Sequence, residues 1–235
     1  MKASIIIPCY NEEKNVPALA DRFARMALPD GVSLELVLVD NGSRDKTGAV
    51  IEALAAQYDF IRPVVVPENQ GYGYGILTGL RAATGDVLGW MHADLQSDPD
   101  VFADMFRRAL TERGAFLYKG RRTHRPVVDT FFTIGMSLME TLYLGMGLWD
   151  INAQPTLLPA SFFRTWENPP SDFSLDLYVY AMAKKKGVPV HRFTSRQYAR
   201  KNGVSSWNTG MAARWRLIRR VWAYSREMRK VLKHV

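Results

Sequence analysis

The sequence predicts an α/β fold in which helices flank a mostly parallel central sheet. In the first hundred residues, short apolar runs alternate with amphipathic helical patterns in strict order. Such alternation requires right-handed crossovers, which place successive strands parallel in one sheet. The chain has 235 residues, 47% of them hydrophobic, so it can form one sizeable core.

The expected elements follow one another without an internal repeat or a low-complexity linker. Four apolar runs are interpreted as buried strands: residues 3–10, 34–43, 61–69 and 86–94. Three amphipathic stretches are interpreted as helices: residues 16–28, 46–58 and 74–85. After about residue 100 the pattern is less regular, although a further helix is expected within residues 171–187.

Composition limits the setting of the protein. The single cysteine, Cys9, cannot form an internal disulfide, and the N-terminal apolar run turns polar too early for a signal peptide. The longest apolar stretch is interrupted by Glu140 and by glycines, so we expect no membrane-spanning helix. These features predict a cytoplasmic protein.

The net charge of +8 is concentrated in the C-terminal tail. Residues 200–235 contain ten Lys or Arg and one acidic residue, which leaves about −1 for the first 199 residues. We expect one domain over residues 1–208, followed by a basic amphipathic helix over 209–235. This helix suits an anionic membrane surface or packing on the domain with a solvated basic face. Nucleic acid is not expected as a partner, because no nucleic-acid module accompanies the basic residues.

Three polar clusters follow the predicted strands, at the sheet edge where open parallel sheets bind ligands. They are "CYNEE" (residues 9–13), "DNGSRD" (40–45) and "HADLQ" (92–96). Asp40 and Asn41 can exchange hydrogen bonds with a base or ribose, or they can form an Asx turn that caps the next helix. The first cluster, taken alone, fits ordinary helix capping.

A glycine cluster, "NQGYGYG", follows the third predicted strand. Gly71, Gly73 and Gly75 give G-x-G-x-G, which differs from the G-x-G-x-x-G of dinucleotide-binding turns, so a nicotinamide site is not expected. Two interpretations stay open. The loop can bring its backbone close to a nucleotide, or it can be a flexible start to a helix.

Three stretches, in this order and spacing, resemble the family 2 glycosyltransferases of the GT-A fold, especially the dolichyl-phosphate mannose synthase-like branch. They are "SIIIPCYNEEKNV", "VLVDNGSRDKT" and "NQGYGYGILTGLRAATGDVLGWMHADLQSDP". The resemblance covers residues 3–125 and implies a Rossmann-like nucleotide-binding half and a UDP- or GDP-sugar donor. The residues that it places at the nucleotide sugar are Pro8, Tyr10, Glu12, Asp40, Asn41, Gly71, His92, Ala93 and Asp94.

In this family a D-x-D motif recruits Mg²⁺ or Mn²⁺ to the donor diphosphate. The family's "DADLQ" is "HADLQ" here, so His92 replaces the first aspartate while Asp94 and Gln96 remain. These two residues offer a carboxylate and an amide oxygen on one face of an extended segment, and hard cations prefer oxygen ligands. We expect them to hold the metal and His92 to contact the nucleotide. Alternatively, Asp94 is an exposed turn residue.

Later stretches extend the resemblance less firmly. "FLYKGRR" makes Arg121 a contact for phosphate or acceptor, unless the stretch is a solvated cationic loop. The family's catalytic acidic position falls near the helix expected within 171–187. This makes Asp176 the candidate base and Asp172 the second candidate, although either acid can instead pair with the helix dipole.

A last stretch, "RQYARKNGVSSWNTG", is similar to the R-x-x-G-x-S loop of the family through Arg200, Gly203 and Ser205. A guanidinium and a hydroxyl near a glycine turn suit a diphosphate, and such a loop would close over the donor. The competing interpretation is a plain basic loop.

Together these features predict a metal-dependent inverting glycosyltransferase with a membrane-associated acceptor, either polyprenyl phosphate or a growing glycan. A phosphate acceptor needs little help from a base, whereas a sugar hydroxyl needs Asp176. The basic tail favours a lipid-linked acceptor and peripheral contact with the inner face of the cytoplasmic membrane. If His92 abolishes metal recruitment, the chain is instead a non-catalytic nucleotide-sugar-binding module or a partner subunit of a membrane enzyme. A homo-oligomer is left open.

Overall fold

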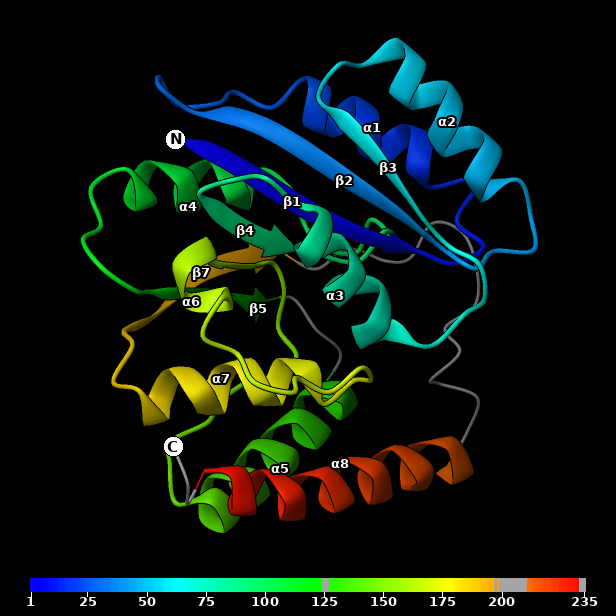
Figure 1. Ribbon diagram of the computed structural model, residues 1–235. Coiled ribbons are helices and arrows are strands. Elements are labelled where there is room, and N and C mark those ends of the chain that lie inside the picture. Colours follow the sequence, from blue (N-terminus) through cyan, green and yellow to red (C-terminus); the bar gives the residue numbers. More distant parts are fainter. Residues whose placement is uncertain (124–126, 197, 199–210, 233–235) are drawn as a thin grey trace.

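The computed structural model describes residues 1–123, 127–196, 198 and 211–232. Its centre is a seven-stranded sheet with the order β3-β2-β1-β4-β6-β5-β7 (Figure 1). Strand β6 runs antiparallel to both of its neighbours, and the other adjacent strands are parallel. The strands are β1 (Lys2–Cys9), β2 (Ser33–Asn41), β3 (Ile61–Val66), β4 (Val87–Trp90), β5 (Leu117–Thr123), β6 (Thr156–Pro159) and β7 (Val190–Arg196).

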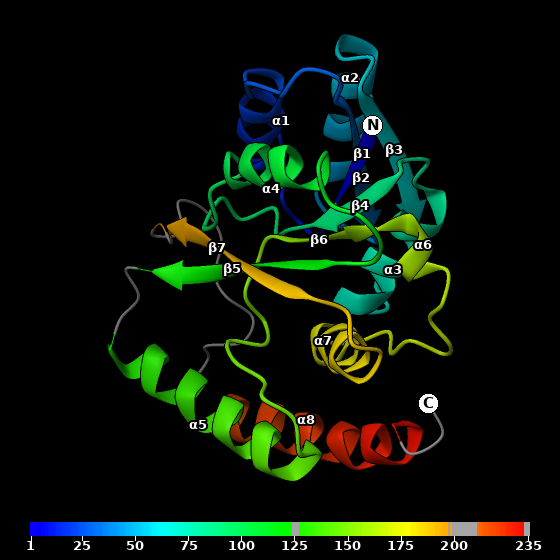
Figure 2. The same cartoon turned by 90° about the vertical axis from the view of Figure 1, so that its left-hand side faces the viewer.

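Helices cover both faces of this sheet. Figures 1 and 2 show α1, α2 and α4 on one face, α3, α6 and α7 on the other, and α5 beside α8 as an outer layer beyond α7. The helices are α1 (Val16–Ala24), α2 (Thr47–Gln57), α3 (Tyr72–Ala82), α4 (Val101–Ala109), α5 (Val127–Leu144), α6 (Ala160–Phe163), α7 (Leu175–Lys185) and α8 (Met211–Val231).

The central strands are apolar because the sheet is buried on both faces. Along β1, Ile5 and Ile7 belong to the core that includes α1 and α4, while Ile6 belongs to the core that includes α3 and α7. All three side chains are fully buried. The predicted α/β fold, with its mostly parallel sheet, is therefore confirmed.

Several predicted boundaries differ from the observed ones by two to four residues, and two of these differences lie near the polar clusters. The strand expected to reach residue 94 ends at Trp90, because the chain turns afterwards and Leu95 has a left-handed φ of +57°. Helix α3 begins at Tyr72, two residues before its expected start. It begins early because the N–H of Tyr74 donates to the carbonyl of Ser171 (2.8 Å) in the segment before α7.

Helix α8 packs its apolar face on the protein. Val221 and Met228 are buried, and the hydroxyl of Ser225 donates to Oε1 of the buried Glu140 of α5 (2.6 Å). Burial raises the pKa of Glu140, although the hydrogen bond from Ser225 opposes this shift. Of the two interpretations of the tail, packing on the domain therefore holds for residues 218–230 and 232. The division of the chain at residue 208 stays a prediction.

No helix in the described part of the chain is long and apolar enough to cross a membrane. This finding includes α5, which contains the apolar stretch that Glu140 interrupts.

The N-terminal ends of β1 and β2 are joined through Glu35. Its carboxylate accepts hydrogen bonds from the hydroxyl of Ser4 (2.5 Å) and from the N–H and hydroxyl of Thr84 (2.9 and 2.8 Å). Lys2 lies 3.3 Å away as an ion-pair partner. Burial alone would raise the pKa of Glu35, but these hydrogen bonds outweigh burial and lower it to about 2.

Because this pKa is depressed, the stabilisation is complete above the unfolded-state pKa of about 4.3 and is lost as the pH falls toward 2. Glu35→Gln should therefore lower the free energy of unfolding at pH 7 by about 1–3 kcal/mol. In urea titrations the difference from wild type should shrink below pH 4. The exposed Glu52→Gln is the control, and a pH-independent difference for Glu35→Gln would contradict the account.

Candidate active site at the carboxyl edge of the sheet

The carboxyl ends of β1, β2 and β4 meet where the strand order reverses. The chain runs from β1 outward to β2 and β3, then returns to β4 on the other side of β1. The register pairs Cys9 with Asp40 and Ile6 with Trp90, so Pro8, Asp40 and the start of the loop at Met91 share one edge. Open α/β sheets bind ligands at this kind of switch point.

Hydrogen bonds join the loops that follow β1 and β2. The N–H of Asn11 donates to the hydroxyl of Ser43 (3.1 Å), and the N–H of Glu12 donates to the hydroxyl of Thr47 (2.8 Å). The predicted contact Glu12 is thus part of this cross-link. Tyr10 is 43% exposed, so its ring remains open to a ligand.

Asp40 and Asn41 have different surroundings. One carboxylate oxygen of Asp40 accepts the N–H of Ser43 (3.0 Å), which is the Asx turn that the sequence allowed. Asn41 is buried, and its Nδ2 donates to the carbonyl of Gly71 (3.0 Å). The Asn41 amide therefore holds the glycine loop, and its contact with a nucleotide stays a prediction.

The glycines of the "GYGYG" motif allow close packing. A Cβ on Gly73 would lie 2.4 Å from the carbonyl oxygen of Asp172, and one on Gly75 would lie 3.0 Å from the Asn41 amide. Gly71 has a φ of +103°, which side chains other than glycine rarely adopt. Neither interpretation of the motif had included this contact between the first turn of α3 and the segment before α7.

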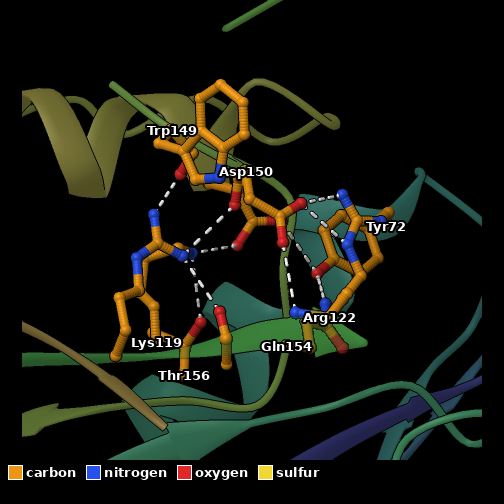
Figure 3. A network of polar contacts seen from close by, with 10 residues as sticks. Tyr72, Lys119, Arg122, Trp149, Asp150, Gln154 and Thr156 are labelled. Carbon is orange, nitrogen blue, oxygen red and sulfur yellow. Dashed lines mark hydrogen bonds and ion pairs between the residues drawn. The ribbon is translucent and has the colours of Figure 1, made fainter. Parts of the chain in front are cut away.

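A buried polar network lies behind this turn (Figure 3). The hydroxyl of Tyr72 donates to Oδ2 of Asp176 (3.1 Å) and accepts a hydrogen bond from Nε2 of Gln154. Nζ of Lys119 lies 3.7 Å from Oδ1 of Asp176 and 3.3 Å from the hydroxyl of Thr156. Burial lowers the pKa of Lys119 to about 8, although the charge of Asp176 opposes this shift. Burial, followed by the charge of Asp176, raises the pKa of Tyr72 well above its usual value.

The two candidate catalytic acids differ in exposure. Asp176 lies in the first turn of α7, and its side chain is only 2% exposed. Asp172 is exposed before the helix, and its Oδ1 accepts the N–H of Ser174 (2.9 Å). The carboxylate of Asp176 is thus enclosed by Tyr72 and Lys119. Its role as a base stays a prediction.

A second ion pair lies at the end of β5. The predicted contact Arg121 is exposed, whereas Nε of the adjacent Arg122 donates to Oδ1 of Asp150 (2.8 Å). Arg192 of β7 donates to the carbonyl of Gly120 (2.9 Å) and to that of Trp149. The sequence prediction missed Lys119, Arg122 and Arg192, because β5 and β7 contain several charged or polar residues and nothing local marks these three.

The "HADLQ" segment forms a turn, so the expected extended geometry was wrong. Oδ1 of Asp94 accepts the N–H of Gln96 (3.1 Å), and Asp94 is buried, which also contradicts the exposed alternative. The ring of His92 lies 5.1 Å from that of Tyr72. Among the described residues, no group of three or more His, Cys, Asp or Glu could hold a metal alone. The donor set still suits Mg²⁺, which is often bound by one carboxylate together with substrate phosphates and water.

The predicted loop contacts Arg200, Gly203 and Ser205 lie outside the described residues.

The fold and this edge are those of an α/β protein with a ligand-binding switch point, and comparison with known proteins identifies the family. The profile of "Glycosyl transferase family 2" matches residues 4–152. The chain therefore belongs to this family, as the resemblance had implied.

Curated relatives match a little under half of the chain. The undecaprenyl-phosphate 4-deoxy-4-formamido-L-arabinose transferase of Shewanella sediminis is 37% identical over 107 residues. The protein of the same name from Pseudomonas aeruginosa is 39% identical over 108 residues. Each match covers 45% of this chain and 32% of the relative, so the similarity spans about a third of the relatives' length.

Solved structures show the same fold over most of the chain. Glucosyl-3-phosphoglycerate synthase from Mycobacterium tuberculosis, in complex with Mn²⁺, UDP and glucosyl-3-phosphoglycerate, has a TM-score of 0.68 at 20% identity. That match covers 86% of this chain and 73% of the other. A mannosyltransferase from Pyrobaculum calidifontis, in complex with GDP-Man and Mn²⁺, has a TM-score of 0.65 at 18% identity, covering 86% and 58%. The chain thus has the GT-A fold.

The contact at Gly73 can be tested by adding one methyl group. Gly73→Ala should lower the free energy of unfolding by about 1–3 kcal/mol, because its Cβ would clash with the Asp172 carbonyl. Gly135→Ala in α5 is the matched control, since nothing lies within 4 Å of its Cβ, and it should be neutral or stabilising by up to about 1 kcal/mol. Equal urea midpoints for the two variants would contradict the packing role of Gly73.

Proposed function

We propose that this glycosyltransferase moves a sugar from a UDP- or GDP-sugar to a polyprenyl phosphate at a membrane surface, with inversion at the anomeric carbon and with Mg²⁺ or Mn²⁺. The observation that carries the proposal is the position of Asp94. It follows β4 on the same sheet edge as Asp40 and Tyr10, at the strand-order reversal. The names of the curated relatives support the polyprenyl phosphate acceptor.

The donor nucleotide would bind across the ends of β1 and β2. The exposed ring of Tyr10 can stack on a base, and the carboxylate of Asp40 can accept a hydrogen bond from a ribose hydroxyl. The diphosphate would then extend toward the loop after β4. Further proposed contacts along this path are Pro8, Glu12, Asn41, Gly71, His92 and Ala93.

Asp94, together with Gln96, would hold the cation against the diphosphate. Asp94 is suited to this because the N–H of Gln96 holds its carboxylate in the loop after β4, at the sheet edge where the diphosphate would arrive. A bound divalent cation would stabilise the negative charge that develops on the leaving nucleoside diphosphate. The exposed Arg121 is a candidate contact for the acceptor phosphate.

A phosphate acceptor also agrees with the burial of Asp176. Direct displacement by a phosphate oxygen needs no proton transfer, because the oxygen is already anionic at neutral pH. A sugar hydroxyl would have to reach a carboxylate that Tyr72 and Lys119 enclose. Of the two acceptor classes that the sequence left open, the lipid phosphate therefore needs no rearrangement of this network.

Asp94→Ala tests the donor site. Transfer from a panel of UDP- and GDP-sugars to undecaprenyl phosphate in vesicles should fall by about 100-fold or more, because the cation loses its protein carboxylate. Thermal stabilisation by UDP or GDP with Mn²⁺ should weaken in parallel.

Asp30→Ala, which removes an exposed carboxylate from the loop before β2, is the control and should behave as wild type. Unchanged turnover in Asp94→Ala would contradict the metal assignment. A glycosylated product that is not recovered in the lipid fraction would contradict the proposed polyprenyl phosphate acceptor.

The membrane contact would be made by α5 and α8 together. Ile134, Leu138 and Leu142 of α5 are 41%, 56% and 74% exposed and lie four residues apart, so they form one apolar stripe. The guanidinium of Arg229 lies over the ring of Tyr143 (5.0 Å), which brings basic side chains of α8 onto α5. Exposed apolar residues beside basic residues suit an anionic bilayer. Among the side chains of α8 that the structure describes, the exposed basic ones are Arg219, Arg220, Arg226, Arg229 and Lys230.

Replacing Leu138 and Leu142 together by Glu should reduce sedimentation with phosphatidylglycerol vesicles about tenfold or more, because it removes apolar contact and adds negative charge. UDP binding should be unchanged. Leu110→Glu, at another exposed leucine beyond the end of α4, is the matched control. Equal vesicle binding by the two variants would contradict this membrane surface.

A further inference from the structure

Tyr72 contacts four residues from three segments that are distant from it in sequence. Its ring stacks on that of Phe173 before α7 (centroids 4.6 Å apart, planes at 14°) and lies 5.1 Å from that of His92 after β4. Its hydroxyl donates to Asp176 of α7 and accepts from Gln154 before β6. Figure 3 shows Tyr72 and Gln154 side by side in this network. The position of Tyr72 thus depends on all four neighbours.

The far side of the network is anchored in the sheet. Lys119 of β5 is fully buried, and its ammonium lies between Thr156 of β6 and Asp176. Asp176 cannot move without separating a buried charge pair, which is strongly destabilising. Lys119 therefore fixes Asp176, and Asp176 fixes the hydroxyl of Tyr72.

A buried charge pair of this kind is a poor source of stability compared with apolar packing. Within the described part of the chain, Oδ1 of Asp176 and Oε1 of Gln154 also have no hydrogen-bond partner, which adds to the cost. Costly polar arrangements of this kind are expected at functional sites.

We propose that Lys119, Asp176 and Tyr72 form a positioning chain that sets the ring of His92 at the donor site. His92 stands two residues before Asp94, so a shift of the Tyr72 ring would be transmitted to the loop that receives the diphosphate. The proposal rests on the proposed function. It replaces the role of Asp176 as a base with that of a positioning residue.

Single and double variants separate the two roles of Asp176. Tyr72→Phe and Asp176→Asn should each lower kcat by about tenfold. The double variant should have the same kcat as the less active of the two single variants, because both substitutions interrupt the same positioning chain. Tyr74→Phe removes a hydroxyl two residues along the same helix and should leave kcat unchanged. A base would give about a 100-fold loss or more in Asp176→Asn and almost none in Tyr72→Phe, which would overturn the proposal.

The Cε1–H signal of His92 in NMR spectra provides a readout that does not need activity. It is assigned by its loss in His92→Asn, and it should shift in Tyr72→Phe and Asp176→Asn but not in Tyr74→Phe. An unmoved signal in Tyr72→Phe would overturn the proposal. A shifted signal in a protein that transfers no sugar would support the positioning chain while refuting the proposed function. Tyr72→Phe keeps the Lys119 pair intact, so it decides the test if Asp176→Asn fails to fold.

Discussion

The close contact between the first turn of α3 and the segment before α7 determines the geometry of the site. It brings the backbone at Gly73 against the carbonyl of Asp172, and it is closed by the hydrogen bond from Tyr74 to Ser171. This contact adds a link between α3 and the segment before α7 to the β4–β6 pairing that joins the two halves of the sheet. Without it Tyr72 could not reach Asp176, and the loop after β4 would lose its support from the C-terminal half.

The N-terminal half could be predicted from sequence because its elements are encoded locally. Alternating apolar runs located β1 to β4 and the helices between them, and the family resemblance placed Asp40 and Asp94 at one edge. The later strands were harder to predict, because β5 and β7 carry charged residues such as Lys119 and Arg192, and β6 has only four residues. Local periodicity is weak in such segments.

The site residues that prediction missed depend on partners far along the chain. No local pattern marks Lys119 as a site residue, since its role depends on the ion pair with Asp176. Gln154 likewise matters only because it donates a hydrogen bond to Tyr72. The tail shows the same limit. Its amphipathic pattern fits a membrane surface or a protein surface equally well. The apolar face of α8 packs on the protein, where Ser225 donates a hydrogen bond to Glu140 of α5. Because α8 packs this face on the protein, most of the exposed apolar side chains of the two helices lie on α5, with Trp222 of α8 beside them.

The central claim is that one edge of the sheet binds a nucleoside diphosphate through a cation held by a single protein carboxylate. A crystal structure with UDP and Mg²⁺ tests it most directly. The account predicts the diphosphate beyond the ends of β1 and β4, with an oxygen of Asp94 about 2.1 Å from the metal. A nucleotide bound away from this edge, or a metal held without Asp94, would contradict it.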